Sequence, residues 1–240
     1  SRYQDAIEAW KKYLLNDPRD FEINRYVGAA YYKTGMLNKA VFHWKQALEV
    51  KKDSKLVSDL GQTEQIFNRL QRSIERTKQQ LAKKPDDRQV LNELAKLFYQ
   101  FGDIDSALNY WKKSLSIYYE DPVIHNSIAT AQLKKGNDEE SLKHWNKVIE
   151  LRPDWPKALN NLAWLLATSS KSEVRDSGQA VILAQRACEL TEYKRTEMLQ
   201  TLAVAYASGD NYKSAIDTIE KALELALARN DEDTVKLLLT

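Results

Sequence analysis

The sequence contains few of the residues that interrupt helices or build cross-linked and metal-bound frameworks. Of its 240 residues only 7 are glycine, 5 are proline and 1 is cysteine. The single cysteine, Cys188, excludes an internal disulfide and any site of four thiolate ligands. It lies in the segment AQRACEL, where a small apolar side chain suits a buried helix face, so we expect it to pack rather than react. Because glycine and proline are scarce while Leu, Ala, Lys and Glu are abundant, the sequence predicts a chain that is nearly all helix.

A charge excess of one sign and long apolar runs are also absent. Lys and Arg total 36 against 34 Asp and Glu, a formal net charge of +2, so we expect no nucleic-acid partner. No stretch reaches the roughly 18 apolar residues of a membrane-spanning helix, and no signal peptide opens the chain. We therefore expect no direct membrane contact from this chain. The expected location is the cytoplasm, or the periplasm if a membrane region has been removed.

A pairing of glycine and tryptophan recurs along the chain. Tryptophan follows glycine by nine residues at Gly35 and Trp44, at Gly102 and Trp111, and at Gly136 and Trp145. Trp10 precedes Trp44 by 34 residues, the last two of these tryptophans are also 34 apart, and the remaining gap of 67 is close to two periods. Such a period is typical of a solenoid of stacked units, a class of protein that holds other molecules. We call Trp10, Trp44, Trp111 and Trp145 the ladder tryptophans.

The repeated unit resembles the tetratricopeptide repeat, whose pattern W-x2-L-G-x2-Y, then A-x3-F, then Pro describes two antiparallel helices. Residues 88–121 read Leu91, Leu94, Ala95 and Phe98, then Ala107 and Trp111. Four other units carry residues at the same positions. They are Asn24, Val27, Gly28, Tyr31, Ala40 and Trp44 in residues 21–54; His125, Ile128, Ala129, Gln132, Ser141, Trp145 and Pro153 in 122–155; Leu159, Leu162, Ala163, Leu166, Ala180 and Ala184 in 156–195; and Leu199, Leu202, Ala203, Tyr206, Ala215 and Ile219 in 196–229. The resemblance implies an all-α, right-handed superhelical solenoid of antiparallel helix pairs.

The unit boundaries follow from the same pattern and predict a single array over residues 1–240. The units are 1–20 (partial), 21–54, 55–87 (degenerate), 88–121, 122–155, 156–195 (with a loop insertion), 196–229 and 230–240 (a capping or partial helix). The chain opens inside a helical pattern, SRYQDAIEAW, so we expect it to be a piece of a longer protein. Its last units resemble the C-terminal repeats of some bacterial glycosyltransferase-associated proteins.

Small residues and glycines mark where helices approach and turn. Gly28 is followed at the same position of later units by Ala95, Ala129, Ala163 and Ala203, and these small residues permit close helix packing. The tryptophans occupy the position usually held by Phe in this family, where we expect each to fill a larger space in the core. We expect positive φ at the turn glycines Gly35, Gly102, Gly136 and Gly209. Pro122 and Pro156 suit the first turn of a helix, and Asp121 is placed to cap one.

Two segments depart from the pattern. Residues 55–87 lack the turn glycine, the alanine and the tryptophan, while their apolar residues alternate at spacings of four and three. We favour a helix pair that turns near Asn68; the alternative is one continuous helix of roughly 45 Å at 1.5 Å per residue. Residues 167–178, ATSSKSEVRDSG, lengthen one turn and are expected to form a solvated connection.

In repeats of this family, the first helix of each unit lines the concave surface with its fifth, ninth and twelfth residues. Here these positions are Arg25, Ala29 and Tyr32; Asn92, Lys96 and Tyr99; Asn126, Thr130 and Leu133; and Asn160, Trp164 and Ala167. The predicted peptide-binding residues are Arg25, Tyr32, Asn92, Lys96, Tyr99, Asn126, Thr130, Asn160 and Trp164. The asparagines recur every 34 residues, and amides that donate and accept suit the backbone of an extended peptide. Alternatively, they are solvated or bond to a neighbouring unit.

Other chemistries are not expected. The two-carboxylate clamp of chaperone-binding repeats is incomplete, since Ala29 replaces its Asn and Lys157 and Asn161 match its later basic positions only in part. His43, His125 and His144 occupy repeat slots that predict packing rather than shared metal coordination. The sequence contains no HExxH, GxSxG, CxxC or phosphate-loop motif. We expect no enzyme activity, no metal and no cofactor.

The sequence therefore predicts a scaffold that binds a protein or an extended peptide. The first alternative is structural self-assembly into a homo-oligomer through exposed repeat ends, at Ser1–Asn16 and Asp231–Thr240. The second is the soluble tail of a membrane glycosyltransferase-like protein.

Overall fold

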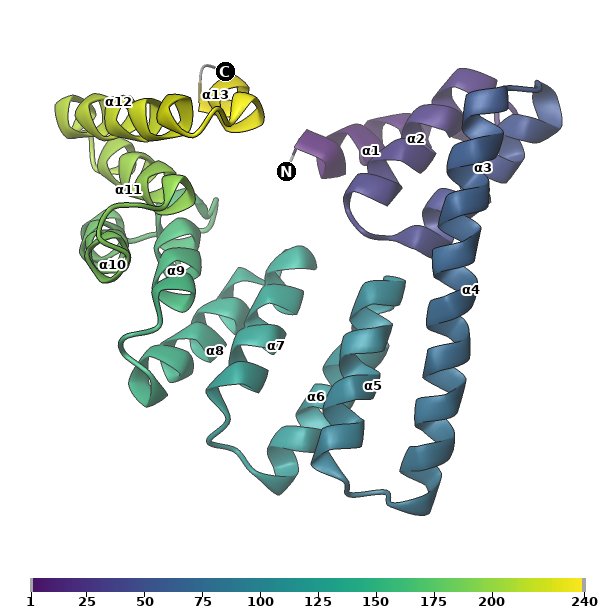
Figure 1. Ribbon diagram of the computed structural model, residues 1–240, viewed down its shortest axis with the longest axis horizontal. Coiled ribbons are helices and arrows are strands. Elements are labelled where there is room, and N and C mark those ends of the chain that lie inside the picture. Colours follow the sequence, from purple (N-terminus) through teal and green to yellow (C-terminus); the bar gives the residue numbers. More distant parts are fainter. Residues whose placement is uncertain (1, 239–240) are drawn as a thin grey trace. The chain divides into compact units, whose positions relative to one another are not determined.

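A computed structural model describes residues 2–238, which fold into thirteen α-helices with no strand in that range (Figure 1). The helices are α1 (Arg2–Leu14), α2 (Phe21–Lys33), α3 (Leu37–Val50), α4 (Ser54–Lys83), α5 (Arg88–Phe101), α6 (Ile104–Ile117), α7 (Pro122–Lys134), α8 (Asp138–Leu151), α9 (Pro156–Thr168), α10 (Ser177–Leu190), α11 (Thr196–Ser208), α12 (Tyr212–Ala228) and α13 (Glu232–Leu238). Of these helices, none combines the length and the apolar composition of a membrane span. The predicted all-α class is confirmed, while Ser1, Leu239 and Thr240 lie outside the described residues.

The helices form two compact units, Ser1–Tyr119 and Glu120–Thr240. In the first unit α2 pairs with α3 and α5 with α6, while α1 packs on α2 and α4 contacts both α3 and α5. In the second unit the pairs are α7 with α8, α9 with α10 and α11 with α12, and α13 packs on α12. The first helices α9 and α11 also contact each other, as neighbouring repeats require.

The helix ends follow local chemistry. The Asp121 carboxylate accepts hydrogen bonds from the backbone N–H groups of Val123 and Ile124, and Pro122 stands in the first turn of α7. Aspartate carboxylates also cap the N-termini of α2, α4, α5, α6 and α10, through Asp20, Asp53, Asp87, Asp103 and Asp176. Each cap satisfies backbone donors that the helix leaves unpaired.

Three of the four predicted turn glycines adopt positive φ. The values are 74° at Gly35, 90° at Gly102 and 78° at Gly136. The prediction is wrong for Gly209, whose φ is −104°, because Asp210 takes the left-handed position with φ 59°. Asp210 is the fifteenth residue of its unit, the position that the other three glycines hold, and aspartate tolerates this conformation better than most residues.

The degenerate unit is one helix rather than two. Helix α4 runs for 30 residues without interruption (Figure 1), so the predicted turn near Asn68 is wrong. Its buried face consists of Leu56, Leu60, Thr63, Leu70, Ile74 and Thr77. This spacing of three and four keeps a single stripe against α3 and α5, and with no turn glycine nothing favours a break.

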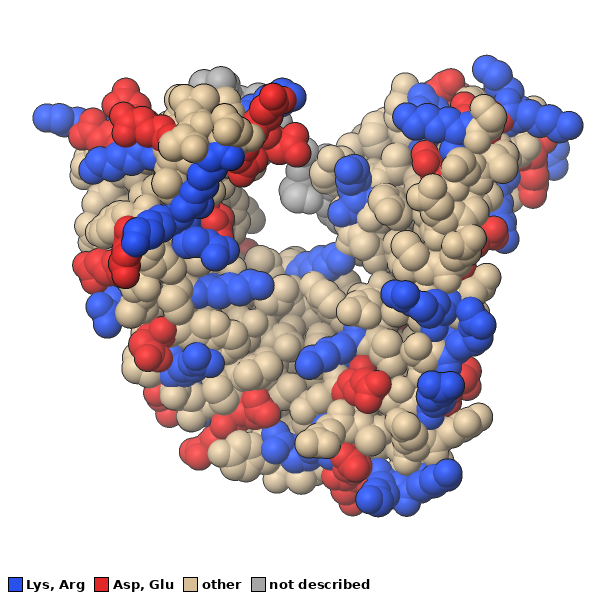
Figure 2. All heavy atoms as spheres, in the orientation of Figure 1, with Lys and Arg blue, Asp and Glu red and all other residues tan. Residues whose placement is uncertain are grey.

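The ladder tryptophans are part of the packing, as predicted. Trp44, Trp111 and Trp145 are buried, while Trp10 is half-buried and stacks on Tyr26 with 5.8 Å between ring centroids. Trp145 is 1% exposed and belongs to the apolar core of the second unit. Figure 2 shows Lys and Arg interspersed with Asp and Glu on the face in view, as the balanced composition predicts.

The inserted turn between α9 and α10 is anchored to the second unit, although most of its residues are exposed. Val174 is 2% exposed and lies in the core of the second unit. The Ser169 hydroxyl donates a hydrogen bond to the Asp138 carboxylate over 2.5 Å. The Lys171 ammonium lies 2.8 Å from the Glu139 carboxylate, and this hydrogen bond lowers the pKa of Glu139 and raises that of Lys171. The expected solvated connection is therefore present for most of these residues, but the turn also carries a buried apolar residue and two polar anchors.

We expect Gly28→Ala to destabilise the first unit. A Cβ at this position would overlap Cδ1 and Nε1 of the buried Trp44 and lie 2.9 Å from its Cγ. Overpacking of this kind costs about 1–3 kcal/mol, which exceeds the helix propensity gained from alanine. Gly61→Ala is the matched control in α4, because its Cβ would have nothing within 4 Å. The control is expected to gain about 0.5–1 kcal/mol. Urea denaturation followed by circular dichroism measures both, and a loss in Gly61→Ala as large as in Gly28→Ala would contradict the steric argument.

A polar pair of the buried Asn24 and the half-buried His43 joins α2 to α3. The Asn24 amide donates to the backbone oxygens of Pro18 and Asp20, both over 2.9 Å, so its Oδ1 faces His43 as an acceptor. His43 Nδ1 lies 2.8 Å from this oxygen and therefore carries the proton. Burial lowers the pKa of His43, and the nearby cations of Lys11 and Lys39 lower it further.

Stability of the first unit is therefore expected to fall on mild acidification. The neutral His43 contributes fully above the unfolded-state pKa of about 6.5, and this contribution is lost as the pH falls toward the lower folded-state pKa. The variant His43→Gln keeps a donor for Asn24 but does not titrate. Urea midpoints measured at pH 7.5 and 5.0 should drop more in the wild type than in this variant, whereas an equal drop would assign the pH dependence to other groups.

Candidate functional site

In the first unit, α2 and α5 carry five of the predicted site residues. Arg25 forms an ion pair with Glu22 at 2.6 Å and lies over the Tyr26 ring, 4.5 Å from its centroid. The hydrogen bond with Glu22 raises the pKa of Arg25. The Arg25 guanidinium is thus already engaged by a carboxylate and an aromatic face. The Lys96 side chain, by contrast, is exposed on α5.

The twelfth residues of these helices pack on the ladder tryptophans. Tyr32 lies beside Trp44 with 5.6 Å between ring centroids, and Tyr99 beside Trp111 with 5.8 Å. Tyr32 stays partly exposed, whereas burial raises the pKa of Tyr99. Each aromatic pair therefore places a tyrosine between the core and the first-helix surface.

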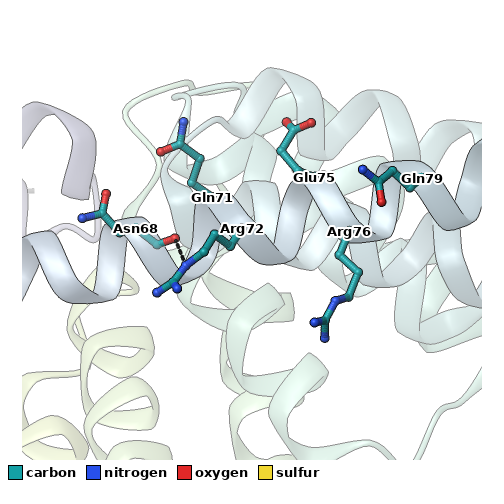
Figure 3. A pocket seen from close by; sticks show the side chains of 6 residues that line it. All are labelled: Asn68, Gln71, Arg72, Glu75, Arg76 and Gln79. Atoms are coloured by element: carbon teal, nitrogen blue, oxygen red, sulfur yellow. Dashed lines mark hydrogen bonds between the residues drawn. The ribbon is translucent and has the colours of Figure 1, made fainter.

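A hollow of about 560 Å³ in the first unit lies along α4 (Figure 3). Its lining residues are Asn68, Gln71, Arg72, Glu75, Arg76 and Gln79, all from this one helix. The Arg72 side chain donates to the Asn68 backbone oxygen over 3.3 Å, as drawn in Figure 3. Ligand pockets are lined mostly by apolar and aromatic side chains, so this polar helix face is a weak candidate.

The second unit contains a pocket that its first helices build together. It has a volume of about 300 Å³ and is lined by Thr130 and Leu133 of α7, Trp145 of α8, Asn160, Asn161 and Trp164 of α9, and Glu197, Gln200 and Thr201 of α11. Three predicted residues, Thr130, Asn160 and Trp164, thus meet at one site. The volume is at the lower end of the roughly 300–1,000 Å³ found for ligand pockets, enough for a single large side chain.

Most of the polar groups in this pocket already have partners. The hydroxyls of Thr130 and Thr201 donate to backbone oxygens one turn earlier in their own helices, over 2.8 and 3.1 Å. Glu197 accepts from Arg195 over 2.9 Å. Burial raises the pKa of Glu197, but its hydrogen bonds to Arg195 and to its own backbone outweigh burial and leave the pKa below its ordinary value.

The amides are the uncommitted polar groups. The side chains of Asn160, Asn161 and Gln200 form no hydrogen bond with the part of the chain that the structure describes, and Asn160 Oδ1 is buried. Trp164 is 43% exposed and offers an apolar surface beside them. The pocket therefore combines an apolar floor with a neutral amide wall, a combination suited to a polypeptide segment.

The side-chain oxygens of the predicted asparagine row point toward the protein interior. Asn126 Oδ1 accepts a hydrogen bond from Trp145 Nε1 over 3.1 Å. Asn92 Oδ1, in the first unit, is buried like that of Asn160. The predicted alternative of a bond to a neighbouring unit does not apply to Asn126, because Trp145 lies on the second helix of the same helix pair.

The remaining candidates have structural surroundings. Cys188 is fully buried, and burial raises its pKa to about 11, as suits a packing role. His125 is buried with its Nδ1 2.8 Å from that of His144, a contact between α7 and α8 that the sequence analysis did not foresee. Across residues 2–238, no three His, Cys, Asp or Glu side chains gather closely enough to hold a metal.

Sequence reasoning missed the contribution of α11 to the pocket. Gln200 is the fifth residue of the unit 196–229, so it continues the row formed by Asn126 and Asn160. The inserted turn separates it from Asn160 by 40 residues instead of 34, and this difference hid the continuation. Counting from the start of each unit, rather than at a constant spacing, would have found it.

Comparison with known proteins agrees with the paired-helix fold. Residues 196–229, which span α11 and α12, match the tetratricopeptide repeat family. Among curated proteins, no relative matches the chain. Similar solved structures include the bacterial proteins MamA (13% identity, 88% of this chain and 94% of that chain covered, TM-score 0.54) and YrrB (14%, 94% and 99%, 0.52), the latter described as having an unusual peptide-binding site. Yeast Tom70 is also similar (15% identity, TM-score 0.56), with 98% of this chain and 58% of that chain covered.

At these identities the similarity is one of fold. Taken with the helix pairs and the matched repeat, it identifies the chain as a protein of tetratricopeptide repeat fold whose α11–α12 pair is itself a tetratricopeptide repeat.

Proposed function

We propose that this protein is a scaffold that binds an extended peptide segment of a partner protein on the first-helix face of the second unit. The observation that carries the proposal is the pocket to which α7, α9 and α11 all contribute. Leu133 and Trp164 offer apolar area for one side chain of the ligand, while Asn160, Asn161 and Gln200 offer neutral amides for its backbone. The general role of tetratricopeptide repeats in protein and peptide binding supports the proposal.

The charges favour a neutral segment over a strongly charged one. Glu197 is the only ionised side chain that lines the pocket, and Arg195 already pairs with it. A ligand cation would have to displace Arg195, and a ligand anion would meet the carboxylate. A backbone segment with an apolar or aromatic side chain avoids both costs.

In the first unit, the proposal extends to Arg25, Tyr32, Asn92, Lys96 and Tyr99 as a further contact surface. Its support is the placement of Tyr32 and Tyr99 against ladder tryptophans, where each tyrosine offers apolar area with a polar tip. In this proposal each unit has its own contact surface for a partner protein, the pocket in the second unit and this aromatic surface in the first.

Selection from a displayed library of random dodecapeptides tests the function, followed by titration calorimetry on the selected sequences. Trp164→Ala is expected to weaken binding about 30-fold, the typical loss of a central aromatic anchor. Ile182→Ala is the matched control, because Ile182 is exposed on α10 of the same unit and does not line the pocket. No enrichment of peptides, or an equal affinity for both variants, would contradict the proposal.

Self-assembly is the second candidate, and one observation favours it. At the C-terminal end, Leu227, Val235 and their neighbours line a hollow of about 250 Å³, and Leu227 and Leu237 are exposed. Sedimentation velocity at 5 and 200 μM tests this candidate, since association requires the mass to rise with concentration. The glycosyltransferase-associated context stays a prediction, and sequence preceding Ser1 would test it.

A further inference from the structure

Two of the ladder tryptophans, Trp44 and Trp145, reach residues of the first-helix surface through their indole N–H groups. Trp145 Nε1 donates to Asn126 Oδ1 over 3.1 Å, and Trp44 Nε1 donates to the backbone oxygen of Arg25 over 3.2 Å. In both cases the acceptor belongs to the fifth residue of the unit, 19 residues before the tryptophan. Phenylalanine, the usual residue in this slot, would fill the core without making either bond.

The bond to Asn126 decides which way its amide points. An indole N–H only donates, and the two halves of an asparagine amide differ, since Oδ1 only accepts and Nδ2 only donates. Trp145 therefore holds Oδ1 toward the core, and the Nδ2 donors of the half-buried Asn126 point away from it. Trp145 also lines the pocket, as does Thr130, one turn after Asn126 on α7.

Asn160 has the same orientation without a tryptophan. Its Oδ1 is buried, and Ala184 occupies the corresponding slot on α10. Asn126 and Asn160 thus turn their oxygens inward and leave N–H groups for a ligand. A surface of this polarity suits a ligand that presents acceptors.

We propose that Trp145 is a positioning residue, which fixes the Asn126 amide with its N–H donors outward so that the second unit selects peptide segments through their backbone carbonyl oxygens. This inference rests on the proposed peptide-binding function and names the part of the ligand that is recognised. It assigns the tryptophan slot a role beyond packing, because the indole N–H, rather than the ring volume, sets the polarity of the binding surface.

The first unit provides an internal comparison. Trp111 and Asn92 are also 19 residues apart, but Trp111 Nε1 and Asn92 Oδ1 are both buried without a hydrogen-bond partner. The hydrogen bond between tryptophan and asparagine is therefore formed in the α7–α8 pair and not formed in the α5–α6 pair. The indole proton of Trp145 should resonate downfield of that of Trp111 and exchange with solvent more slowly.

The test uses the whole chain labelled with ¹⁵N and the capped peptide acetyl-Gly-Gly-Leu-Gly-Gly-amide as the probe. In the wild type, millimolar peptide is expected to shift the side-chain NH₂ signals of Asn126 and Asn160. Trp145→Phe keeps most of the ring but removes the donor, and should weaken binding about 3- to 10-fold, the value of one hydrogen bond. In an Asn126→Ala background, Trp145→Phe should have no further effect on affinity.

Asn126→Asp separates positioning from packing. It keeps an acceptor for the Trp145 indole and removes the outward donors, so the indole signal should stay downfield while affinity falls at least as far as in Trp145→Phe. Retained affinity in Asn126→Asp, or an indole signal of Trp145 that coincides with that of Trp111, would overturn the inference. If the wild type shows no shift for this probe or for library-selected peptides, the proposed function itself fails, whereas binding that ignores Trp145→Phe and Asn126→Asp removes only the positioning role.

Discussion

Trp145→Ala is expected to lower the free energy of unfolding of the second unit by about 3–5 kcal/mol, the range for truncation of a fully buried aromatic residue. The side chain is 1% exposed and packs in the core that α7 to α12 share. Its loss leaves a cavity and removes the donor to Asn126. Urea denaturation followed by far-UV circular dichroism gives the change. Because small domains are stable by only about 5–15 kcal/mol, a loss of this size is a large fraction of the total.

Trp164→Ala is the matched control for this loss. Both tryptophans belong to the second unit, but Trp164 is 43% exposed at the edge of the pocket. Its truncation is expected to cost less than about 1 kcal/mol, as for most exposed positions. Trp145→Ala should therefore lose stability, whereas Trp164→Ala should lose peptide affinity while the stability of the second unit changes little. Equal destabilisation would mean that Trp164 belongs to the core.

Asn68→Pro is expected to destabilise the first unit by about 3 kcal/mol or more. Asn68 lies at the middle of α4, where proline removes a backbone N–H donor and clashes with the carbonyl of the preceding turn. The Arg72 side chain also bonds to the Asn68 backbone oxygen, which a kink would displace. Hydrogen exchange should show faster exchange along α4, and urea denaturation gives the energy.

The control is Asn68→Ala at the same exposed position. Alanine has the higher helix propensity, so this variant is expected to be neutral or more stable by a few tenths of a kcal/mol. A turn at this position would give the opposite ranking, since a turn tolerates proline and gains nothing from alanine. The pair of variants thus tests in solution whether the helix is continuous.

The helix pairs could be predicted from the sequence because their signals are local. Gly102 and Trp111 mark a turn and a core slot at fixed distances, and the positive φ of Gly102 and the burial of Trp111 both follow. These features depend on backbone conformation and on the volume of one side chain. They do not depend on which residues the neighbouring helices bring into contact.

The misses arise where tertiary contacts decide. Asn68 has a residue type that tolerates a turn, but the buried stripe on either side of it holds α4 straight against α3 and α5. In the inserted turn, the polar composition concealed Val174, whose burial depends on the core beneath it. The contact between His125 and His144 likewise depends on how α7 lies on α8. Spacing alone does not encode these arrangements.

The candidate site could be predicted in its residue types but not in its assembly. Asn160, Trp164 and Thr130 were identified by position, and the structure adds Glu197 and Gln200 from α11. Which atoms of the Asn126 amide remain available to a ligand depends on the indole of Trp145, a residue for which the sequence favoured a packing role. The polarity of the surface is thus a property of two helices together.

The continuity of α4 limits how the length of this segment can change during evolution. Each residue inserted into an α-helix rotates everything after it by about 100°, since a turn takes 3.6 residues. An insertion within Ser54–Lys83 would therefore swing Leu70 and Ile74 away from the helices they contact, whereas the turn between α9 and α10 has absorbed extra residues as a folded loop. Homologues are accordingly expected to keep the length of α4 constant and to vary in the loops between paired helices.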